Sequence, residues 1–264
     1  MIFRGDIMHK RILGMCTVFL LLACSQPPKI DKNDRLIVID AGHGGHDSGA
    51  IGDGLYEKDL VLQIAQKTAS AFQHRGYKVH LTRDGDNFIK LSGRTKIADQ
   101  EKADIFISIH ANAVGNKKHF ATAEGIETYF LQKTRDARSQ GIAAKENAAV
   151  LQGTDGLSKH VIIDSVLNGP KIIESNKLAI DVQNNIMQSV KSEYNDVKDG
   201  GVRPAPFYVL VGASRPSILV EVGYITNPKE RARLFSEMYQ ENIAKGIVLG
   251  ATKYLNNRKT EVGF

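Results

Sequence analysis

Apolar runs alternate with helical repeats along the 264 residues of this chain. Residues 36–39 form a wholly apolar run that leads into a glycine-rich loop, the pattern of a central strand covered on both faces. From residue 57 onward, apolar side chains recur at helical spacing as far as Gly76, which stands where a C-terminal cap is expected. A second strand is predicted over 77–82.

The alternation continues to the end of the chain. Ser92 is the predicted cap of a short helix that ends at Ala98. Later strands are predicted over 104–110, 125–131, 207–211 and 217–222, and helices over 137–151, over 176–194 and from Asn227, which precedes Pro228 and Glu230. Strands that alternate with helices in this way predict a layered α/β domain with helices on both faces of its sheet.

The N-terminal segment is typical of an export signal. A basic pair precedes an apolar run over 12–23, which is shorter than the roughly 20 residues that a membrane-spanning helix needs. The run ends in the letters Leu-Leu-Ala-Cys-Ser, similar to a bacterial lipobox, in which cleavage falls before the cysteine and lipid is attached to its sulfur. We therefore expect a signal peptide over 1–23, lipidation of Cys24 and a tether over 24–34. The alternative is an ordinary secretory peptide with an incidental cysteine.

Charge and cysteine content narrow the classes of partner. A formal net charge of +6 favours an acidic partner, such as nucleic acid, anionic lipid or an acidic wall polymer. No arginine-rich helix, zinc-finger spacing or aromatic RNA-binding signature accompanies the charge, so we expect no nucleic-acid partner. Cys16 lies in the predicted signal, and Cys24 would carry lipid, which leaves the folded domain no thiol to pair.

Polar side chains stand at the ends of three predicted strands, where ligand sites gather in α/β sheets. These side chains are His43, His110 and Glu221. The glycine loop around His43 lacks the lysine and hydroxyl of a P-loop, and its glycine frame meets Asp47 where a dinucleotide-binding fingerprint needs a small residue. Two imidazoles and one carboxylate around an open position are the usual ligands of catalytic zinc, so a metal site fits better.

The carboxylate ligand has three candidates. Glu57, at the mouth of the first predicted helix, is preferred over Asp47 and Asp53. Both aspartates lie among turn-forming glycines and serines, where a carboxylate can simply accept backbone hydrogen bonds. Spacing alone leaves all three open.

Glu221 interrupts an apolar strand, and burying an unpaired carboxylate is costly. A structural explanation is an ion pair with Arg94 or Arg215. The functional explanation is a general base that acts beside water acidified by the metal.

Three further polar residues could have either a functional or a purely structural role. Asn112 could orient substrate or only form a turn, and His46 could support the site or only lie in a turn. Asp40 is expected to anchor the glycine loop by accepting backbone hydrogen bonds.

Four segments of the chain resemble the successive motifs of the zinc-dependent N-acetylmuramoyl-L-alanine amidases. They read IVIDAGHGG at 37–45, EKDL at 57–60, SIHAN at 108–112 and VEVGYITN at 220–227. The resemblance covers roughly residues 35–255 and implies a single α/β domain built on a twisted, mainly parallel sheet. It also implies hydrolysis of the amide between N-acetylmuramic acid and L-alanine in peptidoglycan, with a role in wall remodelling or daughter-cell separation.

The resemblance assigns roles to individual residues. It makes His43, Glu57 and His110 the ligands of one zinc ion, which decides for Glu57 against the two aspartates. It makes Glu221 the catalytic glutamate, which takes a proton from water and passes it to the departing amine.

The resemblance also bears on domain organisation and regulation. We expect a catalytic domain over 35–257 and a tail over 258–264. No wall-binding repeat follows in this sequence, so a lipid anchor would hold the enzyme near its polymer, in the periplasm or cell envelope and at the outer membrane of a Gram-negative cell.

The stretch 153–175 is interpreted as an insertion. In some division-associated relatives an autoinhibitory segment lies there and is released by an activator protein, so we expect Glu174 or Asp164 to cover the zinc; the alternative is a plain surface excursion.

Two other functions remain open at this point. A catalytically silent lipoprotein could use the same fold to grip peptidoglycan, although such a module would have no need of Glu221. A zinc peptidase that cuts within the stem peptide would share the site chemistry and differ in its product.

Overall fold

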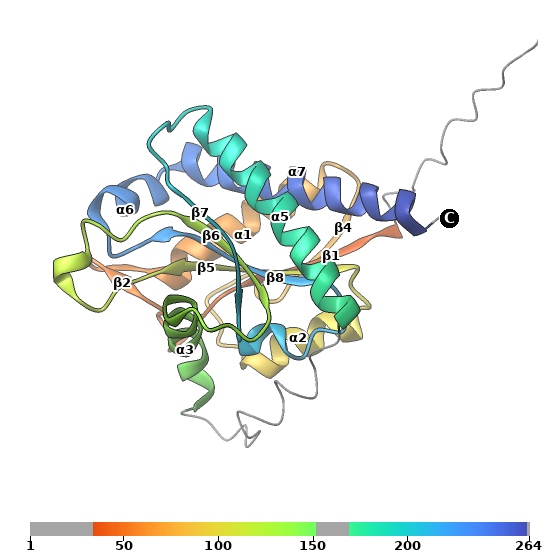
Figure 1. Ribbon diagram of the computed structural model, residues 1–264, viewed down its shortest axis with the longest axis horizontal. Coiled ribbons are helices and arrows are strands. Elements are labelled where there is room, and N and C mark those ends of the chain that lie inside the picture. Colours follow the sequence, from red (N-terminus) through yellow and green to blue (C-terminus); the bar gives the residue numbers. More distant parts are fainter. Residues whose placement is uncertain (1–33, 152–168, 263–264) are drawn as a thin grey trace, which may run out of the picture. The chain divides into compact units, whose positions relative to one another are not determined.

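A six-stranded sheet lies at the centre of the protein, with the strand order β4-β1-β5-β8-β6-β7 (Figure 1). The computed structural model describes residues 34–151 and 169–262. The strands of the sheet are β1 (Leu36–Ala41), β4 (Lys78–Leu81), β5 (Ile105–Asn112), β6 (Ile126–Leu131), β7 (Asp199–Ala205) and β8 (Ser217–Tyr224). Neighbouring strands are parallel except β6 and β8, which run antiparallel, so the predicted mainly parallel sheet is confirmed.

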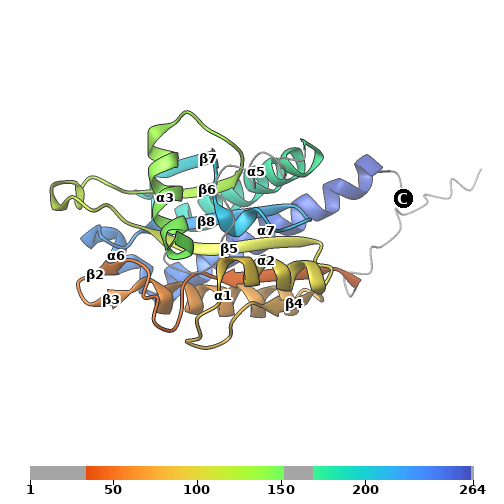
Figure 2. The ribbon, with the colours of Figure 1, turned by 90° about the horizontal axis from the view of Figure 1, so that it is seen from below.

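Helices cover both faces of the sheet, as predicted. They are α1 (Glu57–Gln73), α2 (Leu91–Gln100), α3 (Ala137–Leu151), α5 (Gly169–Lys191), α6 (Pro228–Leu234) and α7 (Glu237–Val262). Alternate strand residues enter two cores: Ile37 and Ile39 pack with α1, α5 and α7, while Val38 packs with side chains of α2 and α3. Helices α2 and α3 lie in front of the strands in Figure 2.

Shorter elements connect this framework. The hairpin of β2 (Ile51–Gly52) and β3 (Leu55–Tyr56) leads into α1, and two 3-10 turns lie at η2 (Lys117–His119) and η3 (Tyr208–Leu210). The start of α6 follows its prediction, because the Asn227 side chain accepts hydrogen bonds from the backbone amides of Lys229 and Glu230.

The prediction of a strand over 207–211 is wrong, because this segment contains the turn η3. The actual strand is β7, whose glycines and Pro204 are poor strand formers. At the edge of the sheet a proline costs no ladder hydrogen bond, which is why the sequence pattern missed it.

Several boundaries differ from the prediction. Helix α2 begins at Leu91 with Lys90 in the cap position, so Ser92 is not the cap. Helix α5 begins at Gly169, with Pro170 in its first turn, so it contains the last seven residues of the expected insertion over 153–175. The rest of that insertion, 153–168, lies outside the described residues. Helix α7, which the sequence analysis did not identify, runs on into the expected tail as far as Val262.

The expected signal peptide, Cys24 and all of the tether but its last residue lie outside the described residues, as does Asp164. Among the residues described, no helix combines the length and the apolar character that crossing a membrane requires.

Candidate metal centre

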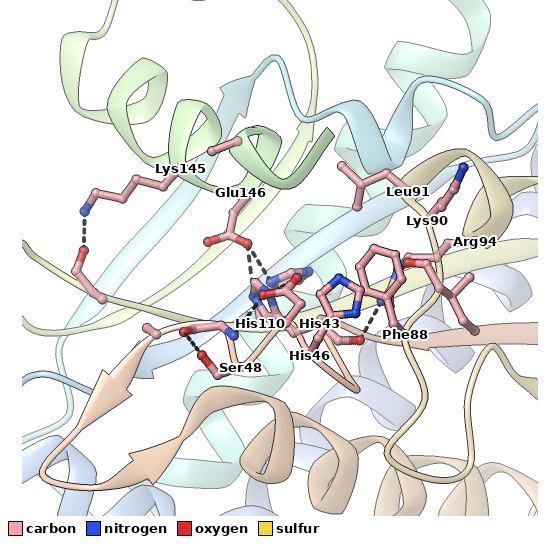
Figure 3. Close-up of a pocket in the computed structure, with 16 residues that line it drawn as sticks. His43, His46, Ser48, Phe88, Lys90, Leu91, Arg94, His110, Lys145 and Glu146 are labelled. Carbon is pink, nitrogen blue, oxygen red and sulfur yellow. Dashed lines mark hydrogen bonds and ion pairs between the residues drawn. The ribbon is translucent and has the colours of Figure 1, made fainter. Parts of the chain in front are cut away.

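Four side chains that can bind metal meet at one edge of the sheet. They are His43, Glu57, His110 and Glu146, and one ligand atom from each lies within 4.8 Å of the others. His43 Nε2 lies 3.1 Å from Glu57 Oε1 and 3.3 Å from Glu146 Oε2. His110 Nδ1 lies 3.2 Å and 3.0 Å from the same two oxygens. In Figure 3 the Glu146 carboxylate points from its helix toward the two imidazoles.

Each member of the cluster comes from a different element. His43 follows β1 in a loop where its φ of 59° is left-handed, a conformation that non-glycine residues seldom adopt. Glu57 is the first residue of α1, and its carboxylate accepts hydrogen bonds from the backbone amides of Ala50 and Ala111. His110 lies in β5 and Glu146 in α3.

The arrangement fits a tetrahedral divalent metal. Ligand atoms about 2.0 Å from a tetrahedral zinc ion lie about 3.3 Å apart, close to the four distances above. His43 Nε2 and Glu146 Oε2 are buried atoms with no hydrogen-bond partner within the described part of the chain. Two imidazoles with carboxylates are also a donor set that zinc prefers.

The predicted rival ligands lie elsewhere. Asp47 Oδ2 is 3.0 Å from His43 Nδ1, so this carboxylate can orient the ring and leave Nε2 free to face the cluster. The Asp53 carboxylate lies 3.3 Å from the guanidinium of Arg231. The geometry therefore selects Glu57 among the three carboxylates.

Charge in the cluster shifts the pKa of every member. Burial lowers the pKa of His110, but the neighbouring Glu146 and Glu57 outweigh it and raise the pKa to about 10. Burial also opposes the charge on His43, and Glu57, Asp47 and Glu146 bring its pKa well above the usual value. Burial raises the pKa of Glu146, yet His110 and His43 hold it at about 2. Without metal, the cluster is a buried group of imidazoliums and carboxylates.

Glu221 is fully buried beside this cluster, paired with His110 in the register of β5 and β8. Both of its carboxylate oxygens lack a hydrogen-bond partner among residues 34–151 and 169–262. Burial, followed by the nearby Glu146, raises its pKa well above the usual value. The ion pair considered as an alternative is absent, because Arg94 lies 2.8 Å from Asp40 and Arg215 is exposed.

Three other predicted residues lie near the cluster and make structural contacts. Asn112 is buried, and its side-chain oxygen accepts a hydrogen bond from the next backbone amide, so it shapes the end of β5. Asp40 was expected to accept backbone hydrogen bonds, but its carboxylate instead accepts those of the Thr82 and Ser108 hydroxyls. His46 lies against the Phe88 ring, with the ring centroids 4.1 Å apart.

Of the two residues expected to cover the site, Asp164 lies outside the described residues and Glu174 does not face the cluster. Glu174 lies on α5, where it accepts a hydrogen bond from the Tyr254 hydroxyl at 2.7 Å. Glu146, which the sequence analysis did not identify, faces the cluster. A signal was available, because Glu146 follows Ile142 and Ala143 at helical spacing and therefore lies on the inward face of α3.

A cleft of about 630 Å³ opens beside the cluster. Its walls include His46, Phe88, Lys90, Leu91 and Lys145, as Figure 3 shows. His43, His110 and Glu146 of the cluster therefore lie at the wall of this cleft.

Comparison with known proteins identifies the family. A family model described as N-acetylmuramoyl-L-alanine amidase matches residues 37–253. The chain belongs to this amidase family. It is 34% identical over 235 residues to N-acetylmuramoyl-L-alanine amidase AmiA of Escherichia coli (strain K12), and this match covers 87% of this chain and 80% of AmiA. It is also 33% identical over 245 residues to the uncharacterized protein YqiI of Bacillus subtilis (strain 168), covering 92% of this chain and 96% of YqiI.

Solved structures of the amidase family share the fold. An N-acetylmuramoyl-L-alanine amidase from Clostridium difficile 630 matches with a TM-score of 0.66 and 33% identity, over 86% of this chain and 99% of that one. The CwlD amidase of Clostridioides difficile, solved in complex with the GerS lipoprotein, matches with a TM-score of 0.62 and 26% identity, over 85% of this chain and all of that one (100%).

We expect the protein to bind one zinc ion and to release protons as it does so. Zinc binds neutral imidazole, whereas the pKa of His110 in the metal-free protein is about 10 and that of His43 is also raised. Both rings are therefore protonated at pH 7, and the apparent affinity should rise as the pH increases toward 10. Calorimetry in two buffers of different ionisation enthalpy measures the released protons.

A pair of histidine variants tests the ligand set. His43→Ala should lose tight zinc binding, while His80→Ala, at a side chain 40% exposed on β4, should keep it. Full zinc content in the His43 variant would contradict the assignment.

Proposed function

We propose that this protein hydrolyses the amide between N-acetylmuramic acid and L-alanine in peptidoglycan and depends on zinc to do so. The observation that carries this proposal is the position of Glu221. Its carboxylate is fully buried, has no hydrogen-bond partner in the described segments and lies next to a cluster of four side chains that can bind metal. Membership of the amidase family supports the choice of bond. A module that only binds its polymer would gain nothing from burying such a charge.

His43, Glu57 and His110 would hold the zinc in this mechanism. A bound zinc ion would polarise the scissile carbonyl, lower the pKa of an attacking water and favour the ionised form of Glu221. Ionised Glu221 accepts the proton of the water as it attacks the lactyl carbonyl. The same carboxyl group then donates that proton to the nitrogen of L-alanine, which leaves as the free amine of the stem peptide.

The pairing of β5 with β8 sets the position of this proton carrier. Glu221 is the direct neighbour of His110 on the adjacent parallel strand, so its backbone cannot move without breaking ladder hydrogen bonds. The buried cluster around it also keeps bulk water from competing for the proton.

We expect Glu221→Gln to bind zinc normally and to lose about 10²–10⁴-fold in turnover, because an amide can neither accept nor return the proton. Purified peptidoglycan is incubated with each protein, and mass spectrometry identifies the released fragments. Glu193→Gln, an exposed glutamate beyond the end of α5, is the control that should leave turnover unchanged.

The products also separate the alternative functions. Intact stem peptides that begin with L-alanine support the amidase, whereas fragments cut within the stem would show a peptidase. No release by the wild-type protein at full zinc content would show a silent binding protein.

We further propose that Glu146 holds the enzyme in an inactive state. Catalytic zinc sites keep one position open for water, and the Glu146 carboxylate occupies the fourth place of the cluster. Helix α3 is fastened there by Lys145, whose ammonium donates to the Ala113 carbonyl at 2.6 Å, and by Asn147, which bonds the backbone of Pro206 and Tyr208. Substrate could reach the metal only after this helix shifts, and a protein that displaces it would act as an activator.

Glu146→Ala should raise the activity of the purified enzyme about 5–150-fold, the usual range for releasing a coupled inhibitory contact. Rates of stem-peptide release at full zinc content are compared with those of Glu241→Ala, an exposed residue of α7. Loss of zinc from the Glu146 variant would instead make this residue a permanent ligand, and an unchanged rate would leave it no inhibitory role.

A cell-envelope location follows from the proposed substrate, and we retain Cys24 as the proposed lipid attachment site. The sequence around Cys24 supports this proposal, and a role in wall remodelling or daughter-cell separation would follow from it. In bacterial cells, Cys24→Ala should move the protein from the membrane fraction to the soluble fraction and remove the mass of the lipid. Membrane retention of the variant would contradict the anchor.

A further inference from the structure

Two buried arginines hold the backbone of the loop that carries His43. Arg83 donates from Nε to the Ala41 carbonyl at 2.9 Å and from Nη2 to the Gly42 carbonyl at 2.7 Å. Arg94 donates from Nη1 to the Ala41 carbonyl and from Nη2 to the His43 carbonyl, both at 2.6 Å. Three successive carbonyl oxygens therefore point at two guanidinium groups.

Arg83 also reaches the second metal-binding element. Its Nη2 donates to the Lys58 carbonyl at 2.8 Å, one residue beyond Glu57 at the start of α1. A single guanidinium thus joins the backbone next to His43 to the backbone next to Glu57. His43 and Glu57 are two of the four residues of the cluster, and they come from separate elements.

The two arginines are themselves fixed in place. They are 3% and 2% exposed, and Arg94 lies 2.8 Å from Asp40, whose carboxylate also accepts hydrogen bonds from the Thr82 and Ser108 hydroxyls at 2.6 Å each. Arg94 Nε donates to the Ile89 carbonyl. The planar, forked guanidinium can bond several fixed acceptors at once, which a lysine ammonium cannot do in the same geometry.

The loop needs such support because of its conformation. His43 has a φ of 59° and is followed by Gly44 and Gly45 at 120° and 60°. A histidine in this left-handed region persists only where its surroundings enforce it. The carbonyl contacts of Arg83 and Arg94 supply that enforcement.

We propose that Arg83 and Arg94 are positioning residues of the metal centre. They hold the His43 loop and the start of α1 at the spacing that the metal requires before it binds. The inference rests on the proposed zinc site and concerns binding of the ion rather than hydrolysis of peptidoglycan. A purely structural role would instead cost stability and leave the metal affinity unchanged.

The test compares Arg83→Lys and Arg94→Lys with the wild-type protein. Zinc affinity is measured by competition with a chromogenic chelator, and the visible absorption spectrum of the Co²⁺-loaded protein reports ligand geometry. We expect the zinc Kd of each variant to rise about 10–100-fold, as is usual when residues behind metal ligands are lost, together with a changed Co²⁺ spectrum.

Arg233→Lys is the matched control. Arg233 is also a buried arginine, 8% exposed, but it pairs with Glu230 and Asp196. This variant should lose thermal stability, as the other two do, yet keep the wild-type Kd and spectrum. Ser108→Ala removes only one hydrogen bond from Asp40, so it tests the inference even if the arginine variants do not fold. We expect it to raise the zinc Kd by a smaller factor.

The outcomes are distinct. Wild-type Kd and spectrum in the folded Arg83 and Arg94 variants would overturn the inference, as would an equal rise in Kd for Arg233→Lys. If the arginine variants fail to fold, an unchanged Kd in Ser108→Ala would also overturn it. If the zinc affinities of the wild-type protein and its variants differ as expected but the wild-type protein leaves peptidoglycan intact, only the proposed function is refuted.

Discussion

The parallel pairing of β5 with β8 is the contact on which the site depends. It sets His110 beside Glu221, although more than a hundred residues separate them in the chain. Both side chains point to the face of the sheet that α3 covers, so the metal cluster and the proton carrier share one buried environment. Because strand residues alternate between faces, a shift of register by one residue would move one of them to the opposite core.

Burial of charge is the second constraint. Two imidazoles and two carboxylates lie together with little exposure to solvent, and the imidazoles and the carboxylates hold one another in their charged forms. Glu221 lies within the same environment without a compensating partner among the described residues, and its pKa is raised as a result. A divalent cation would satisfy the cluster and favour the ionised Glu221 at the same time, so one event would prepare both parts of the chemistry.

The supporting elements differ in how firmly they are held. The His43 loop and the start of α1 are held by buried guanidinium groups, which donate to the carbonyls of Ala41, Gly42, His43 and Lys58. Helix α3 packs Ile142 and Ala143 into the second core, and the polar contact that Lys145 adds is exposed. In the proposed inhibition by Glu146, the metal ligands of the His43 loop and α1 would stay in place while α3 shifts.

The sequence by itself determined the strand ends and the residues that stand there. Apolar runs located β1, β5 and β8, and the polar residue at each strand end identified His43, His110 and Glu221, because local patterning records which side chains are buried. Strand β7 was not predicted, since its glycines and proline are typical of turns and are tolerated in a strand only at the edge of a sheet. Only the tertiary structure decided that Glu146, and not Glu174, faces the cluster, and that Arg94 pairs with Asp40 rather than Glu221. These contacts join residues far apart in the chain, and their partners depend on how helices pack on the sheet, which no local pattern encodes.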